Sequence, residues 1–298
     1  VMVLSAAVAL FTGCGSKDSG ADSKPAGDSK ETTAEAGKDS GSKGTSSKDT
    51  LIIATANETP SVTTNLHNAT AGDYINQMTH EGLFYSSADL TPQPALAESY
   101  EIVSDTEWVF KLKQGVKFHN GNDFTAEDVA YTFHRMLTVE GGVNTEFIDQ
   151  IKGADELLAG ETDTLEGVEV VDDYTIKVTL KEPFAGFLAS ISSPGVSIYD
   201  SEATEAAGDQ FGMDPAVTVG TGPFEFSSWS FNNQLVLTRN EDYWKGASGL
   251  PGVVIKIIPD TETQSMMFES GELDILDLDY AADSVDRFTE TYPDQIVQ

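Results

Sequence analysis

The stretch from 116 to 129, VKFHNGNDFTAEDV, holds a histidine, three acidic residues and a hydroxyl residue. His119 and Asp123 offer an imidazole and a carboxylate, which are donors used by metal sites and by acid–base catalysts. No third ligand follows at matching spacing, and no other histidine stands at metal-ligand spacing from His119. We therefore interpret the stretch as a solvated strand-to-helix connection, and we expect no metal, no cofactor and no catalytic residue there.

Other motifs that resemble catalytic signatures are incomplete. His80-Glu-Gly-Leu-Phe lacks the second histidine of a zinc-protease motif. Gly220-Thr-Gly-Pro-Phe resembles a phosphate-binding loop, but Pro223 removes a backbone N–H that such a loop needs. Neighbouring acids such as Asp172 and Asp173 are expected by chance in a chain with 49 acidic residues. The motifs do not indicate an enzyme.

The elements that must position these residues can be predicted from spacing. Thr125-Ala-Glu-Asp is a capping box, and Val129, Phe133 and Leu137 follow at helical spacing, which predicts a helix over 126–137. Alternating apolar residues predict half-buried strands at 108–112 and 174–180. Further predicted strands cover 51–56, 234–239, 253–258 and 273–278. A further helix is predicted at 74–83. Another is predicted to begin at a second capping box, 261–264, and to end at Gly271. Strands and helices alternate without strict order, which indicates an α/β (mixed α+β) fold with a mixed sheet.

The charge of the chain excludes nucleic acid as a partner. The first 50 residues hold 7 acidic and 6 basic residues, so 42 of the 49 acidic and 11 of the 17 basic residues belong to 51–298. Affinity for nucleic acid comes mainly from lysine and arginine displacing counterions, and a surface this acidic repels phosphate.

Cys14 is the only cysteine, so no intrachain disulfide forms and no structural zinc site is supported. Residues 1–13 are uncharged and apolar, and Leu10-Phe-Thr-Gly-Cys resembles a bacterial lipobox. We interpret 1–14 as a signal-peptide remnant and Cys14 as a lipidation site. Residues 15–50 carry no apolar side chain larger than alanine apart from Pro25, which predicts a disordered tether. Together these features predict an extracytoplasmic domain anchored to the cell membrane by lipid.

Several blocks, in order along the chain, resemble the bacterial family 5 extracellular solute-binding proteins, the dipeptide, oligopeptide and nickel receptors of ABC importers. The blocks are ALAESY (95–100), WVFKLKQGVKFHNG (108–121) with FTAEDV (124–129), DDYTIKVTLKEP (172–183), GTGPF (220–224), RNEDYW (239–244) and SGELDI (270–275).

This resemblance implies two lobes that close on a ligand between them. It places a first lobe at 51–258, with an inserted subdomain at about 81–199, and the truncated start of a second lobe at 259–298. Family members are longer, so the chain resembles a fragment that lacks most of the second lobe.

The resemblance also implies a function without bond making or breaking. We expect a monomeric, lipid-anchored receptor that captures di- and oligopeptides and delivers them to ABC permease and ATPase subunits. First-lobe residues that match ligand-contacting positions are His67, Asn68, Ala69 and Thr70, and with weaker support Thr221 and Gly222. Alternative ligands within the family are nickel, haem and oligosaccharide. From other classes, a surface lipoprotein glycan hydrolase and a structural adhesin remain alternatives.

Overall fold

A computed structural model describes residues 50–67, 69–278 and 284–296 of the 298-residue chain. Cys14, the predicted tether through residue 49 and Asn68 lie outside the described residues. The described residues belong to one compact unit. None of the helices in the described ranges is both long enough and apolar enough to cross a membrane.

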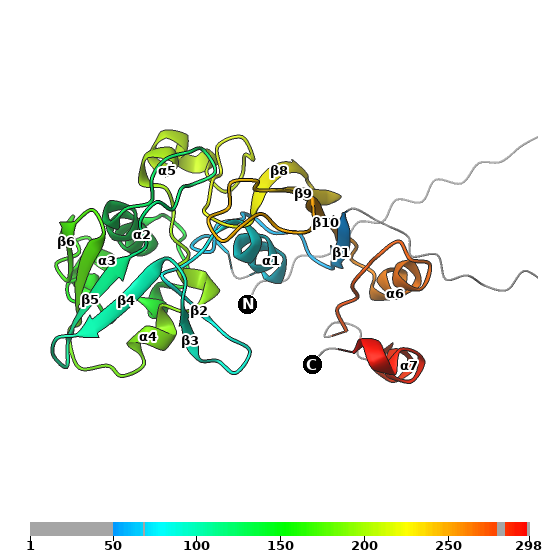
Figure 1. Ribbon diagram of the computed structural model, residues 1–298, viewed down its shortest axis with the longest axis horizontal. Coiled ribbons are helices and arrows are strands. Elements are labelled where there is room, and N and C mark those ends of the chain that lie inside the picture. The colour runs from blue at the N-terminus through cyan, green and yellow to red at the C-terminus, as the bar shows by residue number, and fades with distance from the viewer. Residues whose placement is uncertain (1–49, 68, 279–283, 297–298) are drawn as a thin grey trace, which may run out of the picture. The chain divides into compact units, whose positions relative to one another are not determined.

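One four-stranded sheet has the order β1 (Leu51–Thr55), β10 (Gly252–Ile257), β9 (Gln234–Arg239), β8 (Phe224–Ser230) (Figure 1). β1 pairs with β10 in parallel and the other pairs are antiparallel, which confirms the predicted mixed sheet and three of its strands. Alternate residues of β9 and β10 enter a core together with Ile75 of helix α1 (Thr70–Thr79).

The predicted bounds of the first helix, 74–83, are wrong. α1 begins at Thr70 and ends at Thr79, because the next residues are extended and Gly82 forms an isolated bridge with Ser197. A side chain at Gly82 would lie 2.9 Å from the Val196 carbonyl, so glycine is required for this close backbone approach.

A second, antiparallel sheet has the order β4 (Ala97–Ile102), β5 (Glu107–Leu112), β7 (Thr175–Thr179), β6 (Val168–Asp172). Its alternation agrees with the sequence, since Trp108, Phe110 and Leu112 are all buried. Helix α2 (Ala126–Thr138) packs on β6 and β7 and confirms the prediction at 126–137. The predicted capping box is present, with the Thr125 N–H donating to Asp128 at 2.9 Å.

The remaining elements are short. They comprise the hairpin β2 (Phe84–Ser86) and β3 (Pro92–Pro94), the helices α3 (Ala154–Leu158), α4 (Phe187–Ser190), α5 (Ser201–Ala207), α6 (Thr261–Glu269) and α7 (Val285–Thr291), and the 3-10 turns Thr145–Phe147, Pro194–Val196, Gly208–Gln210 and Pro293–Gln295.

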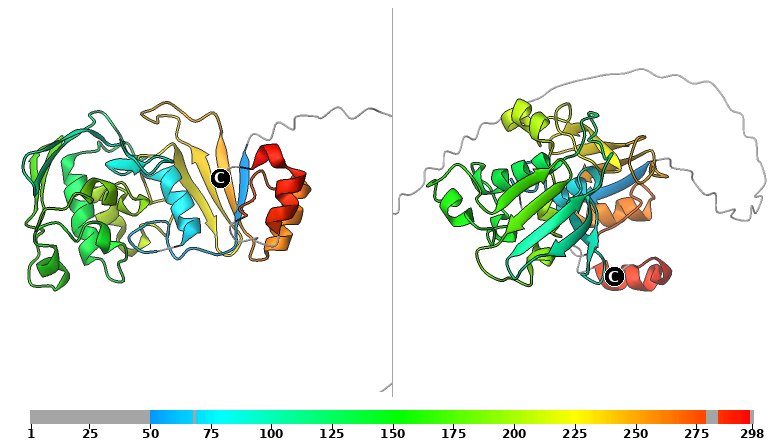
Figure 2. Two further views of the ribbon diagram at one scale, coloured as in Figure 1. Left: turned by 90° about the horizontal axis from the view of Figure 1, so that it is seen from below. Right: turned by 60° about the vertical axis from the view of Figure 1, so that its left-hand side comes forward.

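Two predictions near the C-terminal end of the chain are wrong. The N-cap of α6 is Asp260, whose carboxylate accepts the Thr263 N–H at 2.8 Å, so the proposed capping box starting at Thr261 does not form. The segment 273–278 is not a strand. The Asp274 N–H donates to the carbonyl of Ile52 in the edge strand β1. The Ile52 N–H donates to the Asp274 carboxylate at 2.8 Å and not to a backbone carbonyl. A regular ladder of backbone hydrogen bonds therefore does not continue from this point. Figure 2 shows α6 beside this edge.

Candidate functional site

The two parts of the predicted ligand site lie at opposite ends of α1. His67 and Ala69 precede the helix, and the Ala69 carbonyl accepts the Asp73 N–H in its first turn. The Gly220–Gly222 turn packs on the last helical turn, where the Gly222 N–H donates to the Thr79 carbonyl at 3.0 Å. A helix of this length spans about 15 Å, so the structure does not bring the two parts together.

The segment from Thr59 to His67, here named the polar loop, buries almost all of its polar side chains. Those that are buried are Thr59, Ser61, Thr63, Thr64, Asn65 and His67. Thr64 illustrates how they are held: its Oγ1 lies 3.0 Å from the Tyr199 hydroxyl and donates to the Gly195 carbonyl at 3.1 Å. The Thr64 carbonyl accepts from Asn144 Nδ2 at 2.6 Å. Long-range bonds therefore fix the polar loop to residues far along the chain.

Two side chains of the polar loop keep polar atoms without a partner among the described residues. Asn65 is 0% exposed, and neither atom of its amide is hydrogen-bonded. His67 Nδ1 accepts the Ala69 N–H at 3.1 Å, which leaves the ring proton on Nε2 with no acceptor in range. Burial lowers the pKa of His67 to about 4, so the ring is neutral at pH 7. An unpaired buried polar group costs about 1–3 kcal/mol, so these atoms are places for a water molecule or a ligand.

The Gly220–Gly222 turn has its polar groups engaged within the protein. A Cβ atom at Gly220 would lie 2.0 Å from the Thr79 carbonyl oxygen, and one at Gly222 would lie 2.6 Å from the Met78 oxygen. Thr221 is fully buried and donates to Glu81 at 3.2 Å. These contacts favour a structural role for Thr221 and Gly222.

His119 is not part of a solvated connection, and this interpretation of the sequence is wrong. Its Nδ1 accepts the Gly220 N–H at 3.1 Å, so Nε2 carries the proton and donates to the Gly222 carbonyl at 3.0 Å. Its own N–H donates to the Gly220 carbonyl at 2.9 Å. Burial lowers the pKa of His119, which keeps the neutral tautomer in place. Asp123 is exposed and pairs with Lys117 at 2.7 Å, so it takes no part in this contact.

Two buried carboxylates extend the same contact. Asp128 accepts the N–H and the hydroxyl of Ser201 at 2.9 and 2.8 Å, in addition to capping α2. Asp200 accepts the side-chain amides of Asn120 and Asn122 at 2.8 and 2.9 Å. We name the stretch 119–128, together with Asp200, Ser201 and the Gly220–Gly222 turn, the junction. It joins α2 and the second sheet to the segments that lead into α5 and β8.

Glu81 is the centre of a further cluster of hydrogen bonds within the protein, which the sequence did not predict. Besides Thr221, its carboxylate accepts from Trp244 Nε1 at 2.7 Å, Lys245 Nζ at 2.8 Å and the Tyr243 hydroxyl at 2.9 Å. Burial and the negative charge of Glu81 raise the pKa of Tyr243. One acidic residue does not stand out in a chain with so many acids. The neighbouring residues Tyr243, Trp244 and Lys245 were the feature of the sequence that could have indicated this cluster. The arrangement ties the turn at one end of α1 to the segment after β9.

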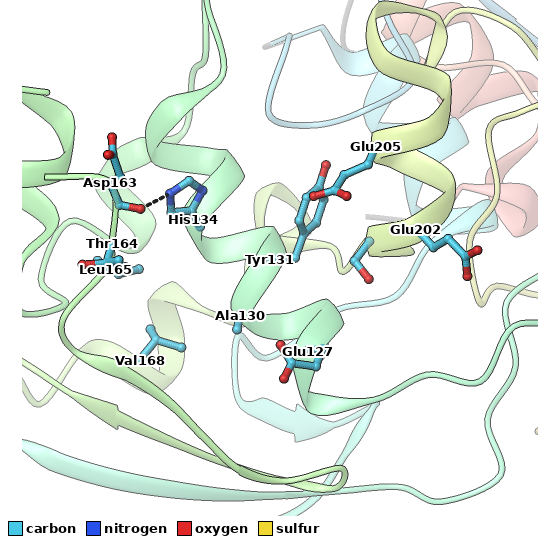
Figure 3. A pocket seen from close by; sticks show the side chains of 11 residues that line it. Glu127, Ala130, Tyr131, His134, Asp163, Thr164, Leu165, Val168, Glu202 and Glu205 are labelled. Atoms are coloured by element: carbon cyan, nitrogen blue, oxygen red, sulfur yellow. Dashed lines mark hydrogen bonds between the residues drawn. The ribbon is translucent and has the colours of Figure 1, made fainter.

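A groove of about 580 Å³ lies between α2 and α5 (Figure 3). None of the predicted site residues lines it. Its charged and aromatic lining consists of Glu127, Tyr131, His134, Asp163, Glu202 and Glu205. Within the described residues no group of three or more histidine, cysteine or acidic side chains is placed to hold a metal ion.

The arrangement of a mixed sheet and a second sheet packed with helices is that of periplasmic binding proteins. Oligopeptide-binding OppA of Listeria monocytogenes, solved with bound peptide, aligns with a TM-score of 0.72 at 26% identity, over 80% of this chain and 48% of that one. A Bacillus anthracis oligopeptide transporter substrate-binding domain aligns with a TM-score of 0.70 at 27% identity, over 76% of this chain and 45% of that one.

Residues 91–295 match the family described as bacterial extracellular solute-binding proteins, family 5 Middle. The chain belongs to this family, as its motifs predicted. Haem-binding protein A of Haemophilus influenzae is 33% identical over 70% of this chain and 39% of the relative. Periplasmic oligopeptide-binding protein OppA of Salmonella typhimurium is 29% identical over 76% of this chain and 43% of the relative.

The chain spans about two fifths of the length of these curated relatives. The family consists of solute-binding transport receptors, which agrees with the expectation that the protein is not an enzyme and removes the support for a glycan hydrolase. The predicted family and fold class are both confirmed.

Proposed function

We propose that the protein is the substrate-binding receptor of an ABC importer, which captures di- and oligopeptides outside the cytoplasmic membrane. The observation that carries this proposal is the family match over 91–295. Relatives named for oligopeptide, dipeptide and glutathione binding support peptides as the ligand class. The relative named for haem binding supports haem as the second candidate.

In this proposal the ligand is bound between two lobes, to which the described residues contribute the first. Contacts made by both lobes stabilise the closed state over the open state, and the permease responds to that difference. We assign the first-lobe contacts to the predicted residues His67 to Thr70 together with Asn65. The side-chain amide of Asn65 has no partner among the residues that the structure describes. We assign a supporting role to Thr221 and Gly222, because their polar groups already bind Glu81, Thr79 and His119.

We further propose that the receptor is anchored to the membrane by lipid on Cys14 and acts as a monomer. The support for the lipid anchor is the lipobox-like Leu10–Cys14 sequence followed by a polar segment. Growth with radiolabelled palmitate should label the wild-type protein and leave Cys14→Ser unlabelled. Equal labelling of both proteins would contradict the assignment of Cys14.

Ligand binding is best tested on the complete gene product. Thermal-shift measurements should compare a pool of di- to pentapeptides with haem, Ni²⁺ and oligosaccharides, because a ligand that binds only the folded state raises stability in proportion to ln(1 + [L]/Kd). We expect the melting temperature to rise with peptides. If only haem raises the melting temperature, haem becomes the proposed ligand. If none of these solutes raises it, the proposed receptor function is contradicted.

A further inference from the structure

A pocket of about 330 Å³, here named the distal pocket, lies at the C-terminal end of α1. Its apolar lining consists of Phe84, Ala95, Pro194 and Pro223, and its polar and aromatic lining includes Gln77, Tyr85, Ser86, Ser193 and Lys245. Binding sites for whole small ligands usually occupy about 300–1,000 Å³. The distal pocket is at the lower end of this range, so it has room for one side chain of a larger ligand.

The charges in the distal pocket are neutralised within the protein. Its charged lining residues are Glu81 and Lys245, whose carboxylate and ammonium groups lie 2.8 Å apart. Burial lowers the pKa of His80 to about 3, so this ring is neutral at pH 7. Phe84 and Ala95 are apolar and each 2% exposed. The pocket therefore suits an uncharged apolar or aromatic side chain.

The distal pocket and the polar loop border on the same turn of the chain, Pro194–Val196. The Gly195 carbonyl accepts the hydroxyl of Thr64 in the polar loop at 3.1 Å. Pro194 lines the pocket, and its carbonyl accepts from Nδ2 of Asn76 in α1 at 3.4 Å. The pocket is therefore a neighbour of the loop to which we assign the first-lobe contacts.

One face of α1 runs from the predicted ligand loop to the distal pocket. Ala69, Asp73 and Gln77 are four residues apart, so they lie in one row along the helix. Ala69 belongs to the loop and Gln77 to the pocket lining. At 1.5 Å per residue the row is about 12 Å long, a length that about four residues of an extended peptide span.

Asp73, in the middle of this row, has no partner for its half-buried carboxylate. The described residues offer it neither a hydrogen bond nor an ion pair, and burial raises its pKa. Taking a carboxylate out of water costs free energy unless a donor or a cation replaces the water. A peptide N–H or an ammonium group of a ligand that lies along the row would supply that partner.

We propose that the distal pocket binds an apolar or aromatic side chain of an extended oligopeptide whose backbone lies along this row from Ala69. The proposal rests on the proposed peptide-binding function and narrows it to longer ligands. A peptide of about five residues reaches from Ala69 into the pocket, whereas a di- or tripeptide is too short. The side-chain amide of Gln77 and the hydroxyl of Tyr85 have no hydrogen-bond partner in the described ranges, so both are available to the peptide.

The test uses the complete gene product and calorimetry with trialanine, pentaalanine and two pentapeptides. These two carry phenylalanine at the first or the last position and alanine elsewhere, which covers both directions of the peptide. Ser86→Trp fills the pocket and Tyr85→Ser removes part of its wall, and both positions are exposed. Ser99→Trp is the matched control, because Ser99 is an exposed strand serine outside the pocket lining. Melting temperatures establish that each variant is folded.

We expect wild type and Ser99→Trp to bind one of the phenylalanine pentapeptides about tenfold or more tighter than pentaalanine, because the ring is removed from water. The preference should fall below about threefold in Ser86→Trp and in Tyr85→Ser. Trialanine should bind wild type and all variants with equal affinity, since it does not reach the pocket.

Equal affinity of wild type for pentaalanine and both phenylalanine pentapeptides would overturn the proposal, and so would a full preference in folded Ser86→Trp. If Ser86→Trp does not fold, Tyr85→Ser decides by the same criterion. Binding of trialanine together with either result would leave the peptide-receptor function in place. Failure of every peptide to bind wild type would contradict that function, and the role of the distal pocket with it.

Discussion

The junction and the polar loop are both built from buried polar residues, but they differ in how completely those residues are paired. In the junction, His119, Asp128 and Asp200 each use their side chains in two or more hydrogen bonds. In the polar loop, Asn65 and His67 keep atoms without a partner among the described residues. The difference teaches that residue type does not separate scaffold from site. We propose that the degree of pairing does, because a fully paired network has no capacity left for a ligand.

Removing a carboxylate from the junction should have the largest effect. Asp128→Ala leaves the N–H groups of Thr125 and Ser201 without their acceptor, and we expect the free energy of unfolding to fall by about 3 kcal/mol. Urea denaturation measures this. The matched control is Glu127→Ala, because Glu127 is an exposed acid in the same helical turn, and it should change stability by less than about 0.5 kcal/mol. Equal losses in the two variants would show that the junction is not the stabilising element.

Acid should weaken the protein chiefly through the buried histidines near α1. Burial lowers the pKa of His67 to about 4 and that of His80 to about 3, whereas the unfolded chain protonates near the ordinary value of 6.5. The unfolded state therefore binds more protons, and stability is retained above about pH 6.5 and lost as the pH falls towards 4. We expect each of the two histidines to contribute a loss of about 2 kcal/mol between pH 7 and pH 5.

The pH effect also separates the two regions. The Gly222 carbonyl and the charge of Glu81 partly oppose the lowering of the His119 pKa, while no such group opposes it at His67. His67→Asn should therefore remove more of the pH dependence than His119→Asn, as measured by denaturation at the two pH values. A larger reduction in His119→Asn would reverse the assignment.

Substitution of His119 should weaken the junction without affecting the ligand. His119→Asn loses two ring hydrogen bonds to the Gly220–Gly222 turn, and we expect a loss of about 1–2 kcal/mol in the free energy of unfolding. Ligand affinity of the complete gene product, measured by calorimetry, should be unchanged. His134→Asn serves as the control, since His134 makes a single bond near the surface, to the Asp163 carbonyl. A tenfold weaker Kd in His119→Asn would place His119 in the ligand site.

The smallest change in stability is expected in the polar loop. Asn65→Leu replaces a buried amide that has no partner in the described part of the chain, so the free energy of unfolding should change by less than about 1 kcal/mol. The control is Thr64→Val, which removes a hydroxyl bonded to Tyr199 and Gly195 and should cost about 1–2 kcal/mol. In the complete gene product Asn65→Leu should still weaken ligand binding at least tenfold. Unchanged ligand affinity would argue against a ligand role for Asn65.

Local signals in the sequence were sufficient for much of the fold. The helix at 126–138 combines a capping box with a regular apolar face, and the strands β5, β9 and β10 alternate in the usual way, so neighbouring residues alone specify them. The segment 273–278 alternates equally well but is irregular, because a strand also needs a partner that accepts a continuous ladder, and spacing carries no information about that partner.

The candidate site was predictable only in part. The loop at His67 was reached through family resemblance, but burial of Asn65 and the pairing of its neighbours depend on Tyr199 and Asn144, which are remote in sequence. His119 was misinterpreted for the same reason, since its partners lie about a hundred residues away, at Gly220 and Gly222. Long-range hydrogen bonds of this kind leave no periodic trace in a single sequence.

The contact between Asp274 and Ile52 has a consequence for solubility. β1 is an edge strand, and an exposed edge presents N–H and C=O groups to which a strand of another molecule can add, the first step of β-aggregation. Asp274 occupies both groups of Ile52 and places a negative charge beside them. Addition of a strand from another molecule at Ile52 is thereby opposed by a single acidic residue.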